Sequence, residues 1–145
     1  MKKNFTTLLF ALVAMMPIGA WAQDAVITGV TITVDGIEYG VGDTAVVTPN
    51  TTSLIITVYG ENFANVTGSN YIWYASGSST TIGNSWTIDT EKNTASRDYS
   101  EYLVWFESTV TPFEVRYSND HKATWINSGV YIVYDFGVSE EEKAV

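Results

Sequence analysis

The chain has 145 residues, and its composition already excludes several classes of protein. Sixteen Asp and Glu residues against seven Lys and Arg residues give a net charge of −9. This charge argues against binding to nucleic acids or anionic membrane surfaces, because Lys and Arg supply the attraction in both cases. Cysteine is absent, which excludes disulfides, thiolate metal sites, thiol nucleophiles and a lipid-bearing cysteine.

Residues 1–22 have the three parts of a secretory signal peptide. Lys2 and Lys3 form a basic start, an apolar run follows, and residues 20–22 form an Ala-x-Ala cleavage site. An uncleaved membrane anchor is the alternative, but the apolar run is short against the roughly 20 residues of a spanning helix. The sequence therefore predicts cleavage before Gln23. The mature chain would be secreted to the periplasm, the cell surface or the extracellular space, with no membrane insertion.

Beyond this segment, apolar and polar residues alternate at a period of two in short runs rich in Val, Ile, Thr, Tyr and Trp. The first run, Val30 to Val34, meets Asp35-Gly36, a pair that suits a two-residue hairpin turn with positive φ. The pattern then resumes at Ile37. The further predicted strands are Ala45–Thr48, Ser53–Tyr59, Asn70–Tyr74, Ser85–Ile88, Glu101–Glu107, Phe113–Tyr117 and Gly129–Asp135.

These short strands predict an all-β fold, an antiparallel immunoglobulin-like β-sandwich of about seven to nine strands spanning residues 23–136. The polar stretch 89–98 is predicted as a loop, and residues 137–145 as an acidic tail or linker. The apolar faces of the strands are expected to line one core between the sheets: Val30, Ile32, Val34, Leu54, Ile56, Val58, Tyr102, Val104, Phe106, Phe113, Val115 and Tyr117.

The predicted strand Glu101–Glu107 supplies the first candidate for a binding residue. Alternation places Tyr102, Val104 and Phe106 on the core face. Trp105 then falls on the opposite face and is a candidate exposed aromatic. An inverted strand or a covering loop is the alternative, because most Trp side chains are largely buried.

A predicted strand runs into the motif Gly60-Glu61-Asn62-Phe63. Gly60 allows a sharp exit from the strand, Asn62 can bond its own backbone, and Phe63 can return to the core. This pattern resembles the strand-and-turn signature of transcription-factor-immunoglobulin (TIG) domains and related bacterial immunoglobulin-like domains. The resemblance implies a binding, spacing or adhesion module of a secreted protein rather than an enzyme.

Ser118, Asp120, Thr124 and Trp125 lie in a predicted hairpin loop. Their spacing resembles the Asp-box, Ser-x-Asp-x-Gly-x-Thr-Trp, in which the Asp and Ser side chains bond backbone N–H groups and the Trp packs beneath. The resemblance implies a structural loop and carries no implication of glycosidase activity. Lys122 stands where the motif has Gly, the residue that normally supplies positive φ.

The sequence predicts no catalytic residue, no metal site and no cofactor. His121 is the only histidine, and no Gly-x-Ser-x-Gly elbow accompanies it. On an extended strand at about 3.3 Å per residue, Glu101 and Glu107 would lie about 20 Å apart, beyond the roughly 5 to 10 Å that glycoside hydrolysis requires. Carboxylates in the predicted turns lie outside any Asp-x-Asp-x-Asp-Gly loop, so calcium stays an open question.

Aromatic residues make up 14% of the chain, more than a small core accommodates, so some are candidates for ligand binding. Flat rings bind sugars by stacking; the alternative is cross-strand ring pairing, worth about 0.2 to 1 kcal/mol for each pair. Trp105 is the leading ligand-binding candidate, with Tyr59 and Tyr131 as further candidates.

Two functions stay open on this basis. One is a secreted, non-catalytic recognition or adhesion module that binds protein or spaces a larger surface assembly. The other is a carbohydrate-binding domain with an exposed aromatic platform. A flat apolar edge strand would favour the first function, and coplanar exposed aromatics the second.

Overall fold

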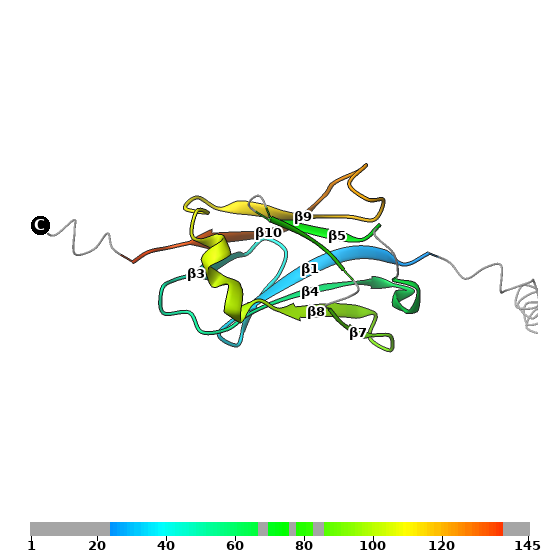
Figure 1. Cartoon of the computed structure of the whole chain (residues 1–145), viewed down its shortest axis with the longest axis horizontal. Coiled ribbons are helices and arrows are strands. Elements are labelled where there is room, and N and C mark those ends of the chain that lie inside the picture. Colours follow the sequence, from blue (N-terminus) through cyan, green and yellow to red (C-terminus); the bar gives the residue numbers. More distant parts are fainter. Residues whose placement is uncertain (1–23, 67–69, 76–77, 83–85, 138–145) are drawn as a thin grey trace, which may run out of the picture.

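The computed structural model describes residues 24–66, 70–75, 78–82 and 86–137. The predicted signal peptide, its cleavage site before Gln23 and the tail from residue 138 lie outside these residues. Two five-stranded sheets face each other as a sandwich (Figure 1). The first sheet contains β1 (Val26–Val34), β2 (Ile37–Tyr39), β4 (Leu54–Glu61), β7 (Thr87–Asp89) and β8 (Thr94–Asp98). The second contains β3 (Thr44–Val47), β5 (Ile72–Ala75), β6 (Ser78–Thr81), β9 (Phe113–Ser118) and β10 (Ile126–Tyr134).

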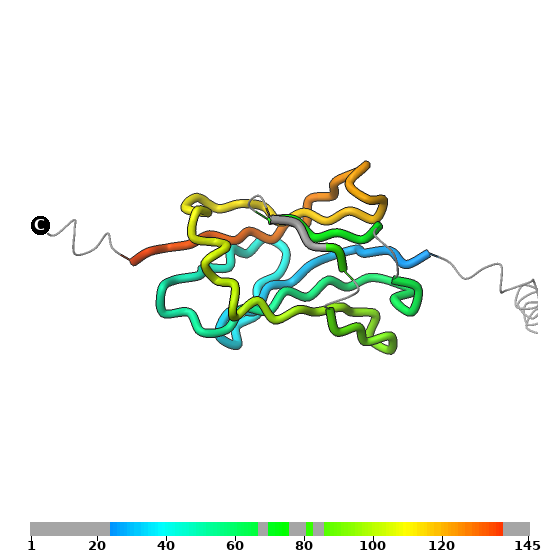
Figure 2. Tube along the Cα trace, viewed as in Figure 1, coloured from blue at the N-terminus to red at the C-terminus, as the bar shows by residue number. Residues whose placement is uncertain are grey.

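The strand order confirms the predicted immunoglobulin-like sandwich. The first sheet runs β2-β1-β4-β8-β7, which contains the A-B-E-D order of such domains. The second runs β3-β10-β9-β5-β6, which contains the order G-F-C-C′. Among the described strands, β3 and β10 form the one parallel pair, so the second sheet is mixed rather than purely antiparallel. The first and last described residues lie at opposite ends of the long axis (Figure 2).

The first hairpin has the predicted turn. Asp35 (φ 48°) and Gly36 (φ 86°) both have positive φ, as a type I′ turn requires. The Asp35 carboxylate accepts hydrogen bonds from the backbone N–H groups of Thr52 (3.0 Å) and Ser53 (2.9 Å). These bonds attach the turn to the residues that precede β4.

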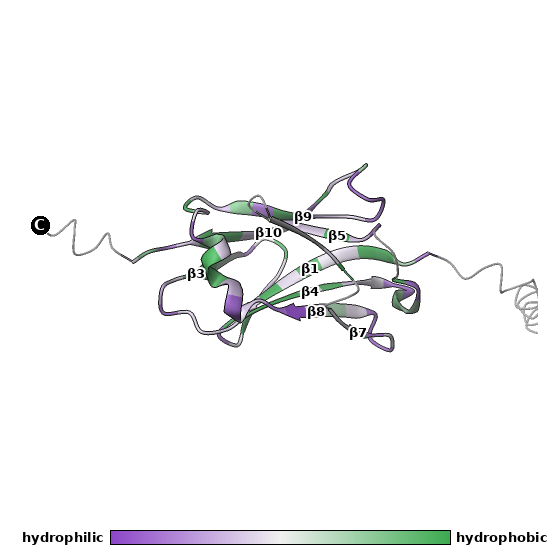
Figure 3. Ribbon diagram, in the orientation of Figure 1, coloured by the Kyte–Doolittle hydropathy of each residue, from purple (hydrophilic) through white to green (hydrophobic). Residues whose placement is uncertain are grey.

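The core is formed by buried residues of both sheets. Apolar residues, green in Figure 3, recur along β1 and β4. Trp73 of β5 is fully buried, and its ring stacks on that of Tyr99 with centroids 5.3 Å apart. A buried Trp on strand C fills the same place in immunoglobulin domains. Nine of the predicted core residues are buried: Val30, Ile32, Val34, Leu54, Ile56, Val58, Phe106, Val115 and Tyr117. Tyr102 and Phe113 are partly buried and pack against this core.

The turn after β4 begins with a close main-chain approach. A Cβ atom on Gly60 would lie 1.8 Å from the carbonyl oxygen of Val26, so only glycine fits there. Asn62 has a φ of 59°. Phe63 is buried in the core at the start of the short 3₁₀ helix η2 (Phe63–Asn65).

The predicted strand Glu101–Glu107 is wrong. The segment forms the 3₁₀ helix η3 (Ser100–Phe106), which is kinked at Tyr102. Side chains on the same face of this segment therefore recur about every three residues, and not every two as expected for a strand. Val104, expected in the core, is 61% exposed, whereas Phe106 is fully buried.

A local polar interaction explains this difference. The Asp98 carboxylate accepts hydrogen bonds from the Ser100 backbone N–H (2.8 Å) and from the Ser100 hydroxyl, so the chain turns before the segment can extend. Asp98 followed three residues later by Glu101 is also a helix-start pattern. Apolar alternation in the same segment masked that signal.

The loop predicted for residues 89–98 is also wrong, because β8 and the β7–β8 turn lie there. β8 pairs with β4 on one side and with β7 on the other. Ala95 is its buried residue, and the polar side chains around it made the segment look like a loop. Backbone pairing with β4, rather than the burial of large apolar side chains, holds this strand in the sheet.

Candidate functional site

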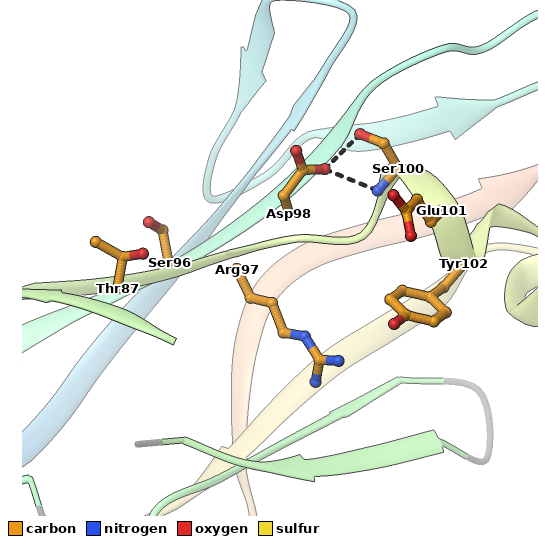
Figure 4. A pocket seen from close by; sticks show the side chains of 7 residues that line it. All are labelled: Thr87, Ser96, Arg97, Asp98, Ser100, Glu101 and Tyr102. Carbon is orange, nitrogen blue, oxygen red and sulfur yellow. Dashed lines mark hydrogen bonds between the residues drawn. The ribbon is translucent and has the colours of Figure 1, made fainter. Parts of the chain in front are cut away.

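A depression of about 460 Å³ lies where β8 meets η3 (Figure 4). It is lined by Thr87 of β7, by Ser96, Arg97 and Asp98 of β8, and by Ser100, Glu101 and Tyr102 of η3. We call it the η3 groove.

The groove follows a free edge of β8. β7 pairs with β8 only from Thr94 to Ser96, so Arg97 and Asp98 lie beyond the pairing. Successive residues of a strand point to opposite faces. Accordingly, the Arg97 and Tyr102 side chains project to one side of β8 and that of Asp98 to the other (Figure 4). A ligand at this edge therefore meets side chains from both faces of the strand.

Arg97 is held in place by two aromatic rings. Its guanidinium carbon lies 4.9 Å from the ring centroid of Tyr99 and 5.4 Å from that of Tyr102. Such cation–π contacts orient the planar guanidinium without using its N–H groups. Within the described part of the chain the guanidinium makes no hydrogen bond or ion pair. Its donors are free to bind a ligand.

Asp98 supplies a fixed negative charge. The hydrogen bond from the Ser100 hydroxyl, together with that from the Ser100 backbone N–H, lowers the pKa of Asp98 below its ordinary value of 3.8. The carboxylate is therefore ionised at neutral pH. Both bonds reach Oδ1, which leaves Oδ2 as the acceptor for an incoming group.

Trp105 does not line the η3 groove itself but borders it, because its ring packs on the lining residue Tyr102. It is 41% exposed, and its ring stacks on that of Tyr102 with centroids 4.6 Å apart and an interplanar angle of 30°. Three residues per 3₁₀ turn place residue i+3 above residue i, which explains the pair. Trp105 is thus exposed as the sequence suggested, but because of the helix and not because of strand alternation.

Tyr99 joins the groove to the core. The ring is fully buried and touches the groove residues Tyr102 and Trp105 at centroid distances of 6.2 and 6.1 Å. On its other sides it contacts core rings: Trp73, Trp86 and Phe106. Buried packing of this kind fixes rotamers, so the groove is preorganised.

The other two predicted ligand-binding residues lie elsewhere. Tyr59 of β4 packs against Gly29, where an added Cβ would lie 2.3 Å from the tyrosine ring. Tyr131 of β10 donates a hydrogen bond from its hydroxyl to the Glu114 carboxylate at 3.4 Å. Among the described residues, no ring contact joins either tyrosine to Trp105. The three candidates therefore do not form one surface.

The predicted structural loop between β9 and β10 is tied by its own side chains. The Ser118 hydroxyl donates to Asp120 Oδ1 at 2.8 Å, and the same oxygen accepts the Thr124 backbone N–H at 2.8 Å. Ser118 Oγ accepts the Lys122 backbone N–H at 2.9 Å. The bond from Thr124, followed by that from Ser118, lowers the pKa of Asp120. Its carboxylate is thus occupied within the loop.

Lys122 occupies the position that is glycine in the Asp-box, and it has a φ of 73°. His121 beside it has a φ of 56°. Trp125 is partly buried and packs on Tyr74 with ring centroids 5.4 Å apart at 53°. The Arg116 guanidinium carbon lies 4.8 Å from the Tyr74 centroid, so a cation covers the Tyr74 ring. Because the two rings are also tilted, Tyr74 and Trp125 do not form a flat platform.

A second, apolar depression of about 320 Å³ lies beside the edge strand β3. Its lining includes Val46, Val110, Val133 and Phe136, and three of these are exposed. We call it the β3 groove. An apolar surface next to an unpaired strand edge is a typical protein-docking feature.

The sequence did not indicate Arg97 and Tyr99 as site residues. Arg97 lies within the predicted loop 89–98, and Tyr99 lies between that loop and the predicted strand Glu101–Glu107. The Asp98-x-x-Glu101 pattern was the one local signal for the helix that positions the site. No sequence periodicity indicates that Arg97 would lie on Tyr99 and Tyr102, because that contact depends on the strand–helix junction.

No family model matches the chain, and no curated protein or solved structure matches it. Among the described helices, none is long and apolar enough to cross a membrane. The described residues also contain no group of three or more His, Asp or Glu side chains arranged to hold a metal ion.

Proposed function

We propose that this chain is a secreted, non-catalytic recognition module that binds its ligand at the η3 groove. The observation that carries the proposal is the exposed Trp105, whose ring stacks on Tyr102. The Tyr102 ring also contacts the guanidinium of Arg97, whose N–H groups make no hydrogen bond within the described residues. Trp, Tyr and Arg are the residue types in which binding energy concentrates. A rigid, partly exposed cluster of all three costs little conformational entropy on binding.

The acid–base chemistry of the groove supports binding rather than catalysis. Hydrolysis of a glycoside needs a carboxyl group with a raised pKa to protonate the leaving group. Asp98 has a lowered pKa instead, because Ser100 stabilises its charged form. The single histidine, His121, belongs to the β9–β10 loop, not to the groove.

The test is a binding screen with the mature protein on a glycan array and a panel of extracellular proteins. Trp105→Ala is expected to lose binding by about tenfold or more. Val104→Ala is the matched control, because Val104 is equally part of η3 and is exposed. Both variants should melt close to the wild-type temperature. Equal binding by both variants and by the wild type would contradict the proposed site.

A second candidate function, protein binding or spacing through the β3 groove, is favoured by one observation. Exposed Val46 lies on the edge strand β3, next to exposed Val110 and Phe136. Lys on an edge strand blocks pairing with another chain. Loss of a protein partner in Val46→Lys, with no change in Trp105→Ala, would favour this function over binding at the η3 groove.

A further inference from the structure

We propose that the ligand of the η3 groove is an uncharged saccharide, held by hydrogen bonds at the β8 edge and by stacking on Trp105. The inference rests on the proposed function, because it specifies the ligand class of the same site. It follows from the hydrogen-bonding groups of the groove, from its charge and from the aromatic ring at its rim.

The hydrogen-bonding groups of the groove match sugar hydroxyls. Each hydroxyl both donates and accepts, so a surface that binds several of them needs donors and acceptors close together. Arg97 provides fixed N–H donors on one side of β8, and Asp98 provides a carboxylate acceptor on the other. The hydroxyls of Thr87 and Ser96 and the Glu101 carboxylate complete a mixed polar lining.

Electrostatics select an uncharged sugar. The groove contains one cation, Arg97, and two carboxylates, Asp98 and Glu101. The whole chain is also acidic, with a net charge of −9. Like charges raise the free energy of binding of sulfated, phosphorylated or carboxylated glycans. A neutral hydroxylated ligand has no such penalty.

The rim supplies an apolar contact for the carbon face of a sugar ring. Tyr102 packs on the Trp105 ring, and Trp105 as a whole residue is 41% exposed. A flat ring of this kind packs against the C–H groups of a pyranose. The groove volume of about 460 Å³ lies in the range of about 300 to 1,000 Å³ that is typical of small-ligand sites.

The experiment measures binding of the mature wild-type protein to neutral oligosaccharides by calorimetry, with uronate-containing, sialylated and sulfated glycans as charged comparators. The proposal expects neutral sugars to bind best. Because no ion pair forms with such a ligand, Kd should change less than about twofold between about 0.1 and 1 M NaCl.

Three variants locate the site. Trp105→Ala and Arg97→Gln should each weaken neutral-sugar binding about tenfold, while Lys92→Gln, which removes a cation from the β7–β8 turn, should not. Arg97→Gln keeps hydrogen-bonding capacity but loses the planar cation held by Tyr99 and Tyr102. Near-ultraviolet circular dichroism of each variant checks that the aromatic cluster is intact.

The outcomes separate this inference from the function on which it rests. Preferential binding of a charged glycan, or of a protein through the same two residues, overturns the saccharide inference and leaves the recognition function standing. Failure of every neutral sugar to bind also overturns the inference. Ligand binding that neither Trp105→Ala nor Arg97→Gln weakens overturns both.

Discussion

The side-chain amide of Asn119 forms two hydrogen bonds with the main chain of Ile27. Asn119 Oδ1 accepts the Ile27 N–H at 2.8 Å, and Asn119 Nδ2 donates to the Ile27 carbonyl oxygen at 3.2 Å. β2 pairs with β1 only from Ile32 to Val34, so the edge of β1 at Ile27 has no neighbouring strand in the sheet. The amide takes the place of that strand. It joins the loop of one sheet to the first strand of the other, across 92 residues of sequence.

Asn119→Ala should therefore destabilise the fold. The substitution leaves a partly buried N–H and C=O of Ile27 without partners, and the expected loss in the free energy of unfolding is about 1 to 3 kcal/mol. Urea unfolding measures it. Asn127→Ala removes an exposed asparagine of β10 and should stay within about 0.5 kcal/mol of the wild type. Equal stability of the two variants would show that the contact contributes nothing.

Lys122→Gly should stabilise the protein. An L-residue at a φ of 73° is strained, and glycine removes that strain while its greater freedom in the unfolded chain offsets part of the gain. A net increase of about 0.5 to 1 kcal/mol in the free energy of unfolding is expected. Lys92→Gly, in the β7–β8 turn and without positive φ, should lower stability instead. If both substitutions changed the free energy of unfolding in the same direction, strain at Lys122 would not be the cause.

Acid should destabilise the fold through three exposed aspartates. Asp35, Asp98 and Asp120 each have a pKa below the ordinary value of 3.8, because backbone or hydroxyl groups donate to the charged carboxylate. A group with a lower pKa in the folded state contributes stability above its unfolded-state pKa, and that stability is lost as pH falls through the folded-state pKa. Thermal melts between about pH 7 and pH 2 measure the loss.

Asp120→Asn is the matched variant for this pH dependence. It should have a lower melting temperature than the wild type at pH 7. The difference should shrink as pH falls below the ordinary aspartate pKa of 3.8 and through the lower pKa of folded Asp120, where the wild-type carboxylate becomes protonated. A difference that is constant at every pH would show that the hydrogen bonds do not depend on ionisation.

Val104→Asp should be tolerated, since Val104 projects from η3 and is 61% exposed. Its free energy of unfolding should stay within about 0.5 kcal/mol of the wild type. Phe106→Ala, two residues further on, should cost about 3 to 5 kcal/mol, because this fully buried ring contacts Trp73 and Tyr99. Chemical denaturation of the two variants compares them directly. Unfolding of Val104→Asp would restore the strand assignment of this segment.

The sequence alone determined the sandwich because its apolar strands, unlike β8, are recognisable from their own residues. Val30, Ile32 and Val34 alternate with polar residues, and only a sheet with one buried face satisfies that pattern. Asp35-Gly36 likewise specifies its turn through the φ angles that the two residues can adopt. Such information lies in a few consecutive residues, so it can be recognised without knowing how the rest of the chain folds.

Only the tertiary structure decided how the parts of the candidate site come together. Residues 94–98 form a strand because β4 offers backbone partners along the whole segment and β7 along residues 94–96, although their side chains are mostly polar. η3 forms because Asp98 bonds Ser100, and a period of three then stacks Trp105 on Tyr102. Arg97 is placed against Tyr99 only where this strand and helix meet. Contacts between elements depend on their packing in space, and a period along the chain does not contain that information.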